Sequence, residues 1–210
     1  MNLLGIESSS RKLLVGLMKG DSFSELHSEK INDTANSLPR LSKKIINNAS
    51  LSFENLDAIC ISSGPGSFTG LRVGMSYAKG IAMALDIPIV PVSTFDSLAY
   101  KNTSKKLSTL IYSHTNTFYI CEYSINDGIL LKSSKPKSIL KENVMELSQD
   151  IVFNGPTNIF KDLKAHDLKI EFTDLSVNNI LKIAQQNFKL LKTKSLDNLV
   201  PDYVGNFEVK

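Results

Sequence analysis

A glycine-rich segment, residues 62–74, has the residue types and spacing best suited to chemistry. It lies between an apolar run and a helical pattern and consists of Ser-Ser-Gly-Pro-Gly-Ser-Phe-Thr-Gly-Leu-Arg-Val-Gly. A loop that leads from a strand into a helix presents backbone N–H groups and the positive end of the helix dipole to an anion. Two hydroxyl side chains could add donors or cap the helix. The residues of this candidate phosphate loop are Gly64, Pro65, Gly66, Ser67 and Thr69.

Two known phosphate-binding patterns do not fit the segment. A P-loop needs Gly-x4-Gly-Lys-Ser/Thr, but Thr69 stands where the second glycine should be and no lysine follows. A dinucleotide loop needs Gly-x-Gly-x-x-Gly, whereas Gly64, Gly66 and Gly70 are spaced Gly-x-Gly-x3-Gly. A third interpretation stays open, in which the glycines only form a tight turn and let a helix pack closely.

The helix predicted over residues 70–85 carries small residues four positions apart. Gly70, Gly74 and Ala78 share one stripe, so a helix of the same chain or of another could approach closely. Interior glycines cost a helix about 1 kcal/mol each relative to alanine. Close packing or a function should therefore compensate for them.

Other side chains do not have the spacing of a metal site or a disulfide framework. The three histidines, His27, His114 and His166, are isolated from one another, and Cys60 and Cys121 form no CxxC pair. We therefore expect no metal site in this chain.

The composition disfavours several classes of protein. The chain has 210 residues, is 42% hydrophobic and carries a net charge of +3, which is ordinary for a globular protein. Its 24 basic residues include only three arginines and form no basic stripe, so autonomous RNA binding is disfavoured. It lacks an apolar run of about 18 residues that could span a membrane and a basic N-terminal stretch. We expect a cytoplasmic protein without membrane association.

Hydrophobic periodicity predicts alternating strands and helices in both halves of the chain. In the first half we expect strands over 3–6, 13–18, 23–29, 56–61 and 88–92 and helices over 38–49 and 70–85. In the second half we expect strands over 107–112, 118–125, 129–131 and 151–153, a turn at 126–128, and helices over 139–147 and 178–191. Residues 161–177 stay unassigned.

The repeated order of elements predicts an α/β protein with two duplicated βββαβα lobes. This is the order of the ribonuclease-H-like, actin-type fold. We place an N-terminal lobe at residues 1–98 and a smaller C-terminal lobe at 99–210, and we expect the last residues to return to the first lobe.

The string Ser-Gly-Pro-Gly-Ser-Phe-Thr-Gly-Leu-Arg-Val-Gly at residues 63–74 resembles the signature of the YeaZ (TsaB) family, the bacterial tRNA threonylcarbamoyladenosine biosynthesis proteins. The first strand and turn at 4–9, the Leu38-Pro39 helix start, the segment 90–99 and the Pro-x-Tyr segment at 200–204 resemble the family as well. The resemblance covers residues 1–100 well and the rest by length and element order.

This resemblance implies an actin-like (ASKHA) fold and a role in forming threonylcarbamoyladenosine (t6A) at adenosine 37 of tRNAs that read codons beginning with A. It implies a non-catalytic subunit that dimerises with and activates a larger catalytic homologue, TsaD. The ATPase TsaE joins that pair, and homodimers also occur in the family. Contact with tRNA is then expected only through the complex. We expect no cofactor of the chain's own, with ATP or ADP at a subunit interface as the open alternative.

In the family, the first two helices of the N-terminal lobe form most of the interface. Carried over here, those helices are residues 38–49 and 70–85. The interface residues that this implies are Leu38, Leu41, Ile45, Gly70, Arg72, Val73, Gly74, Tyr77, Ala78 and Ile81. We then expect Gly74→Leu or Ala78→Glu to abolish dimerisation with the homologue and to leave the fold intact.

Departures from the catalytic homologue favour a pseudo-enzyme. That homologue carries a His-x3-His pair on its first helix, where two histidines share a face and can chelate one metal. The comparable positions here are Asp33 and Ser37. The second half departs from the resembled family itself. Residues 112–114 stand where that family often has Asp-Ala-Arg, and residues 154–156 stand where it has Gly-x-Gly, which counts against nucleotide binding by the second lobe.

The alternative function is a stand-alone actin-fold ATPase or phosphotransferase. It would place Glu7, Ser8, Ser9 and Ser10 around a nucleotide together with the glycine loop. Glu7 is one methylene longer than the aspartate that the family usually has there. A peptidase is disfavoured, because the sequence has no Ser/His/Asp order and no His-Glu-x-x-His motif.

Overall fold

The computed structural model describes residues 1–126, 129–160 and 169–204. The chain divides into two compact units. The first is built from Met1–Ser97 and Ser176–Asp202, and the second is centred on Leu98–Leu175. The sequence analysis assigned residues 99–210 to the second lobe and expected only the last residues to return to the first. In the structure the chain rejoins the first unit at Ser176, because α4 and α5 pack on the first sheet.

The first unit contains a five-stranded mixed sheet in the order β3-β2-β1-β4-β5. Its strands are β1 (Asn2–Glu7), β2 (Leu14–Lys19), β3 (Ser22–His27), β4 (Ala58–Gly64) and β5 (Ile89–Ser93). The first three form an antiparallel meander, while β4 pairs in parallel with both β1 and β5. All seven residues of β4 are buried, as expected for a strand in a parallel arrangement covered on both faces.

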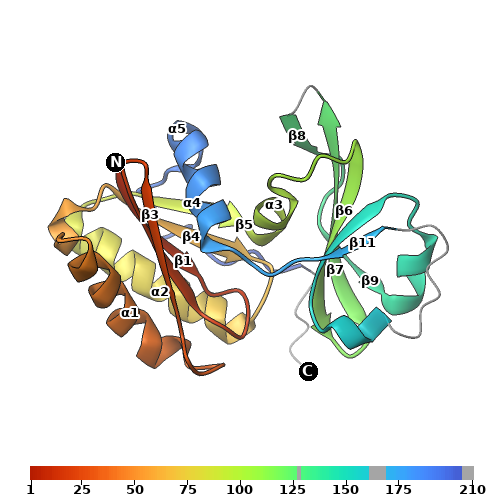
Figure 1. Cartoon of the computed structure of the whole chain (residues 1–210), viewed down its shortest axis with the longest axis horizontal. Helices are drawn as coiled ribbons and strands as arrows, with labels where there is room; N and C mark the ends of the chain where they lie inside the picture. The colour runs from red at the N-terminus through yellow and green to blue at the C-terminus, as the bar shows by residue number, and fades with distance from the viewer. Residues whose placement is uncertain (127–128, 161–168, 205–210) are drawn as a thin grey trace. The chain divides into compact units, whose positions relative to one another are not determined.

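Helices cover both faces of this sheet. They are α1 (Thr34–Asn48), α2 (Phe68–Leu85), α4 (Val177–Gln186) and α5 (Phe188–Leu191). Two short elements complete this part of the chain, the 3-10 turn η1 (Phe53–Asn55) before β4 and α3 (Thr94–Ala99) after β5. Figure 1 shows α1 and α2 on one face of the sheet and α4 on the other. The helix predicted over 178–191 is interrupted at Asn187, which separates α4 from α5.

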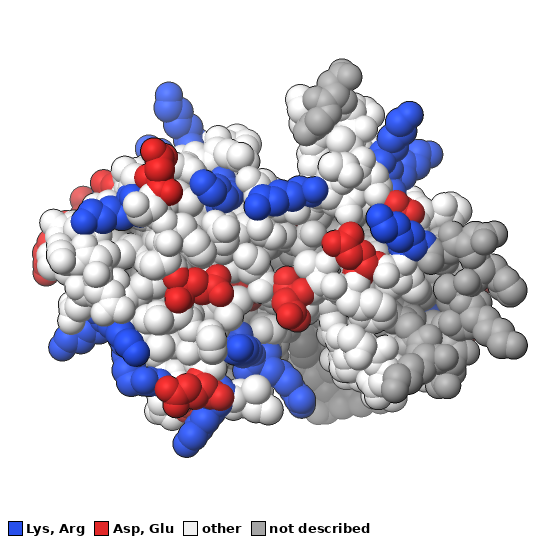
Figure 2. Space-filling model, viewed as in Figure 1, with Lys and Arg blue, Asp and Glu red and all other residues white. Residues whose placement is uncertain are grey.

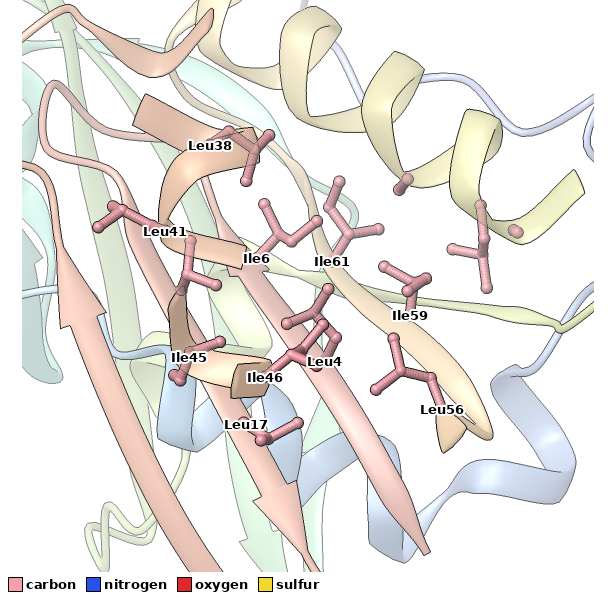
Figure 3. Close-up of a cluster of buried hydrophobic side chains, with 14 of the residues drawn as sticks. Leu4, Ile6, Leu17, Leu38, Leu41, Ile45, Ile46, Leu56, Ile59 and Ile61 are labelled. Atoms are coloured by element: carbon pink, nitrogen blue, oxygen red, sulfur yellow. The ribbon is translucent and has the colours of Figure 1, made fainter. Parts of the chain in front are cut away.

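The main core lies between the sheet and α1 and α2. Figure 3 shows the apolar side chains of α1 directed toward those of the strands. Leu38, Leu41 and Ile45 lie three or four residues apart on α1. Together with Ile46 they are buried against Leu4, Ile6, Leu17, Ile59 and Ile61 of the sheet. The same helical spacing that predicted α1 therefore directs its apolar stripe into the core.

A pair of glycines allows α4 to pack closely on the other face. Gly5 and Gly16 are partners in the register of β1 and β2. A Cβ atom at Gly5 would lie 2.7 Å from Val177 Cγ2, and one at Gly16 would lie 3.0 Å from Leu181 Cδ1. The lack of a side chain at these two positions thus makes the space in which α4 sits.

The second unit contains a sheet in the order β11-β10-β6-β7-β8, with β9 pairing to β7. Its elements are β6 (Lys106–His114), β7 (Thr117–Asn126), β8 (Ile129–Lys132), β9 (Lys137–Leu140), η2 (Lys141–Glu146), β10 (Asp150–Asn154), η3 (Thr157–Phe160) and β11 (Ile170–Phe172). Leu110, Phe118, Ile120, Val144, Ile151 and Phe153 form its core on one face of the sheet.

Two expectations for the second unit need correction or fall outside the description. The helix predicted over 139–147 is wrong, because this segment forms the end of β9 and the 3-10 turn η2. Val144 is the only buried residue of η2 among those whose burial is described. The segment therefore has no buried apolar stripe of the kind that stabilises a longer helix. The predicted turn at 126–128 lies partly outside the described residues. No helix in the described part of the chain combines the length and apolar character needed to cross a membrane.

Candidate functional site: the glycine loop and helix α2

The glycine loop joins the carboxyl end of β4 to the N-terminus of α2. Gly64 ends β4 with a φ of +116°, a backbone conformation that favours glycine. Ser67 is the N-cap of α2, and its Oγ accepts a hydrogen bond of 3.2 Å from the Gly70 N–H. This satisfies one of the backbone donors that a helix N-terminus leaves free.

The turn after β1 packs directly against this loop. The Ser67 N–H donates to the Ser9 carbonyl at 2.6 Å. A Cβ atom at Gly66 would lie 2.6 Å from Ser9 Cβ, and one at Gly70 would overlap the Ser8 carbonyl oxygen. The glycines therefore allow close packing within the chain, and two of the loop's backbone donors, those of Ser67 and Gly70, are already used.

Glu7 is the last residue of β1 and directly precedes this turn. Its side chain is fully buried, and its Oε1 accepts hydrogen bonds from the Ser9 N–H at 2.6 Å and from Ser9 Oγ at 2.5 Å. Burial raises the pKa of Glu7 above the ordinary value of 4.5, although the bonds from Ser9 act in the opposite direction. Glu7 Oε2 and the neighbouring Ser8 Oγ are buried without a hydrogen-bond partner among the described residues.

The structure brings together most, but not all, of the residues proposed for a nucleotide loop. Ser8 and Ser9 lie against the glycine loop, and Glu7 bonds Ser9 from behind them. Ser10 instead bonds the Lys12 carbonyl at 2.9 Å, and Thr69 is exposed on the first turn of α2. A phosphate at this loop would have to compete with contacts that the chain makes to itself.

The small-residue stripe of α2 faces inward, which corrects the expectation that it meets a partner. Gly70, Gly74 and Ala78 are buried, and a Cβ atom at Gly74 would overlap Ser8 Oγ. Because a side chain at 74 would meet Ser8 and Ala78 is buried, we expect Gly74→Leu and Ala78→Glu to destabilise the first unit, so they cannot separate docking from folding. Leu38, Leu41 and Ile45 are likewise core residues and cannot touch a partner in this conformation.

The outward face of α2 carries a different row of residues. Of the residues carried over from the family, Arg72 is exposed, while Val73, Tyr77 and Ile81 are half-buried at the margin. The exposed row, with residues three or four positions apart and an apolar side chain at each end, consists of Phe68, Arg72, Ser76, Gly80 and Met83. We call it the α2 outer row.

Two apolar side chains stand out in the α2 outer row. Phe68 is 39% exposed and Met83 is 75% exposed. The Arg72 guanidinium carbon lies 3.6 Å from the centroid of the Phe68 ring, a cation–π contact. Sequence reasoning missed Phe68 and Met83, although the four-residue spacing from 68 to 80 could have indicated a second face.

The positions that correspond to the metal-binding histidines of the catalytic homologue bond to each other. Ser37 Oγ donates to Asp33 Oδ2 at 2.7 Å at the start of α1. Within residues 1–126, 129–160 and 169–204, no group of three or more His, Cys, Asp or Glu side chains could hold a metal ion. His166 lies outside the described residues. Figure 2 shows basic and acidic side chains interspersed over the described surface in view.

The first sheet, ordered β3-β2-β1-β4-β5 with helices on both faces, and the second mixed sheet define a two-lobed α/β protein of the actin-like class. A family model described as "TsaD: tRNA N6-adenosine threonylcarbamoyltransferase" matches residues 26–201. The chain belongs to this family, and within it to the TsaB/YeaZ proteins, as its relatives indicate.

Named relatives match the chain over different lengths. The tRNA threonylcarbamoyladenosine biosynthesis protein TsaB of Bacillus subtilis is 25% identical, and the match covers 97% of this chain and 94% of that protein. TsaB of Buchnera aphidicola from Schizaphis graminum is 32% identical over 108 residues, about half of each protein. The solved structure of YeaZ from Pseudomonas aeruginosa has a TM-score of 0.82 at 18% identity and covers 97% of this chain and 99% of that one.

Proposed function

We propose that this chain is a non-catalytic subunit required for t6A formation in tRNA, the modification for which its TsaB relatives are named. The observation that carries this proposal is the match to the Bacillus subtilis protein, because it extends over 97% of the chain. The inferred role is to bind and activate the catalytic homologue TsaD. The ATPase TsaE would join that pair, and the chain would meet tRNA only through the complex.

The α2 outer row is the surface that we assign to the catalytic homologue. It is an exposed helix face with apolar groups at both ends, Phe68 and Met83. Gly80 between them has no atom within 4 Å of the position of a Cβ, so a partner's backbone could approach α2 there. Stable contacts of this kind bury on the order of 1,600 Å² in total, which also requires neighbouring exposed residues of α1. The same surface would serve a homodimer.

The surroundings of Glu7 support the non-catalytic part of the proposal. A carboxylate that binds a metal–nucleotide complex must reach its ligand, but Glu7 is buried and holds Ser9. Two backbone N–H groups near the loop are already hydrogen-bonded: that of Ser67 donates to the Ser9 carbonyl, and that of Gly70 donates to Ser67 Oγ. We therefore assign no nucleotide to this chain alone, and any ATP or ADP would bind at the interface with the partner.

A pair of matched variants tests the docking surface. Met83→Glu places a charge in the α2 outer row and should weaken binding to the TsaD homologue of the same host at least tenfold, because an unpaired charge is costly to bury. Ile129→Glu is the control, since Ile129 is also an exposed hydrophobic residue, at 62% exposure, but lies on β8. Binding is measured by calorimetry or size-exclusion chromatography.

The two variants should have the same thermal unfolding midpoint as the wild type. Equal binding by Met83→Glu and the wild type would contradict the assigned surface. Weaker binding by Ile129→Glu alone would move the surface to the second unit.

A further inference from the structure

After α5 the chain continues along the first unit as an irregular segment, residues 193–202. Thr193 pairs with Ile89 at the free edge of β5, with backbone hydrogen bonds of 2.8 and 2.9 Å. Lys194 Nζ lies 2.9 Å from Asp86 Oδ1 at the end of α2. We call this segment the strap.

The strap continues over the core and ends at the glycine loop. Leu196 and Leu199 are partly buried against the main core. At its end, Asp202 Oδ2 accepts a hydrogen bond of 2.6 Å from Ser63 Oγ. The Asp202 N–H also donates to the Ser63 carbonyl at 2.7 Å. Ser63 and Asp202 are separated by 139 positions in the sequence, so these two bonds close a long loop of chain onto β4.

Gly64 connects this contact to α2. A Cβ atom at Gly64 would lie 2.6 Å from the Asp202 carbonyl oxygen and 3.2 Å from Leu71 Cδ1. Gly64 is therefore enclosed between the end of the strap on one side and the first turns of α2 on the other. Displacement of Asp202 would free the residue from which the loop turns into α2.

We propose that the Ser63–Asp202 pair is a latch that fastens the strap to the glycine loop and fixes the loop and the start of α2. When the latch is closed, Phe68 and Arg72 are held in place for a partner. Opening it loosens the loop and exposes the β5 edge near the strap, because an uncovered edge offers unpaired backbone groups to other chains. The effect on partner binding rests on the proposed function, but the latch itself does not.

The latch is tested in the full chain by hydrogen–deuterium exchange of peptides that cover residues 62–70 and 193–204. Asp202→Ala and Ser63→Ala each remove the side-chain bond. A hydrogen bond to a charged group contributes enough that its loss should speed exchange in 62–70 about tenfold. The double variant should add nothing further, since both changes remove the same bond. Asp197→Ala is the control, because it removes one exposed acid from the same strap.

Exchange in 62–70 that is the same in Asp202→Ala and in Asp197→Ala would overturn the latch. Should Asp202→Ala not fold, Asp202→Asn carries the same prediction with a smaller increase, since a neutral hydrogen bond is weaker than a charge-assisted one. Faster exchange combined with unchanged affinity for the TsaD homologue would overturn the link to docking. A wild-type chain that binds no such homologue would overturn the proposed function and leave the exchange result standing.

Discussion

Glu7 is a buried acid in a place where the resemblance led us to expect a ligand-binding carboxylate. Its burial raises its pKa above 4.5, so above that pH the folded chain holds the proton more tightly than the unfolded chain does. Stability from this group is complete below pH 4.5 and is lost as the pH rises through the folded-state pKa. Glu7→Gln, which cannot ionise, should not show this loss.

The measurement is the thermal unfolding midpoint of the wild type and Glu7→Gln between pH 4.5 and 8. We predict that the wild type loses stability relative to Glu7→Gln as the pH rises. Glu25→Gln, on the exposed strand β3, controls for the loss of one carboxylate. A wild type that gains on Glu7→Gln at higher pH would show that the carboxylate is stabilised in its charged form.

Two glycines of α2 should respond to alanine in opposite ways. Gly80 has open space around it, so Gly80→Ala should raise the free energy of unfolding by up to about 1 kcal/mol through helix propensity. At Gly70 the new methyl group would overlap the Ser8 backbone, so Gly70→Ala should lower it by about 1–3 kcal/mol. Urea titration of the two variants measures both changes. If both variants were more stable than the wild type, the turn after β1 would be able to shift away from a methyl group at position 70.

At the scale of elements, α4 packs on the Gly5–Gly16 pair. This contact joins the two stretches of chain, Met1–Ser97 and Ser176–Asp202, that make up the first unit. A side chain at Gly16 would meet Val177 Cγ1 at 2.9 Å. Gly16→Val should lower the free energy of unfolding by about 1–3 kcal/mol, the usual cost of overpacking, and should increase proteolysis near α4. Gly20→Ala is the comparison in the adjacent turn. Gly20 has no neighbour within 4 Å, so a loss of stability there would come from its φ of +58° and not from overpacking. If Gly16→Val were no less stable than the wild type, α4 would not depend on this gap.

The elements of the first unit follow closely from the sequence. Local periodicity predicted β1, β4, α1 and α2, because an apolar stripe or run must be buried somewhere. It could not show against what. The stripe Gly70, Gly74 and Ala78 has the spacing of a docking face. Its two glycines instead pack on the turn at Ser8, more than sixty positions away, and Ala78 lies in the main core. The failed helix over 139–147 has the same cause, since its apolar residues fit a short turn as well as a helix.

At the scale of the whole molecule, contacts distant in sequence determine the candidate site. The first unit is built from two separate stretches of chain, Met1–Ser97 and Ser176–Asp202, and the strap brings Asp202 to Ser63. The sequence contained the signature at 63–74 and the segment at 200–204 as separate motifs. Their direct contact could not be derived from spacing. Residue types and local periodicity do not indicate which distant loop a segment will contact.

The central claim is that this chain is required for t6A formation. The most direct measurement is nucleoside mass spectrometry of tRNA from its own host after depletion of the protein. We predict that t6A falls and that re-expression of the wild type restores it, whereas Met83→Glu restores it poorly and Ile129→Glu restores it fully. Unchanged t6A in the depleted cells, with depletion verified, would contradict the account.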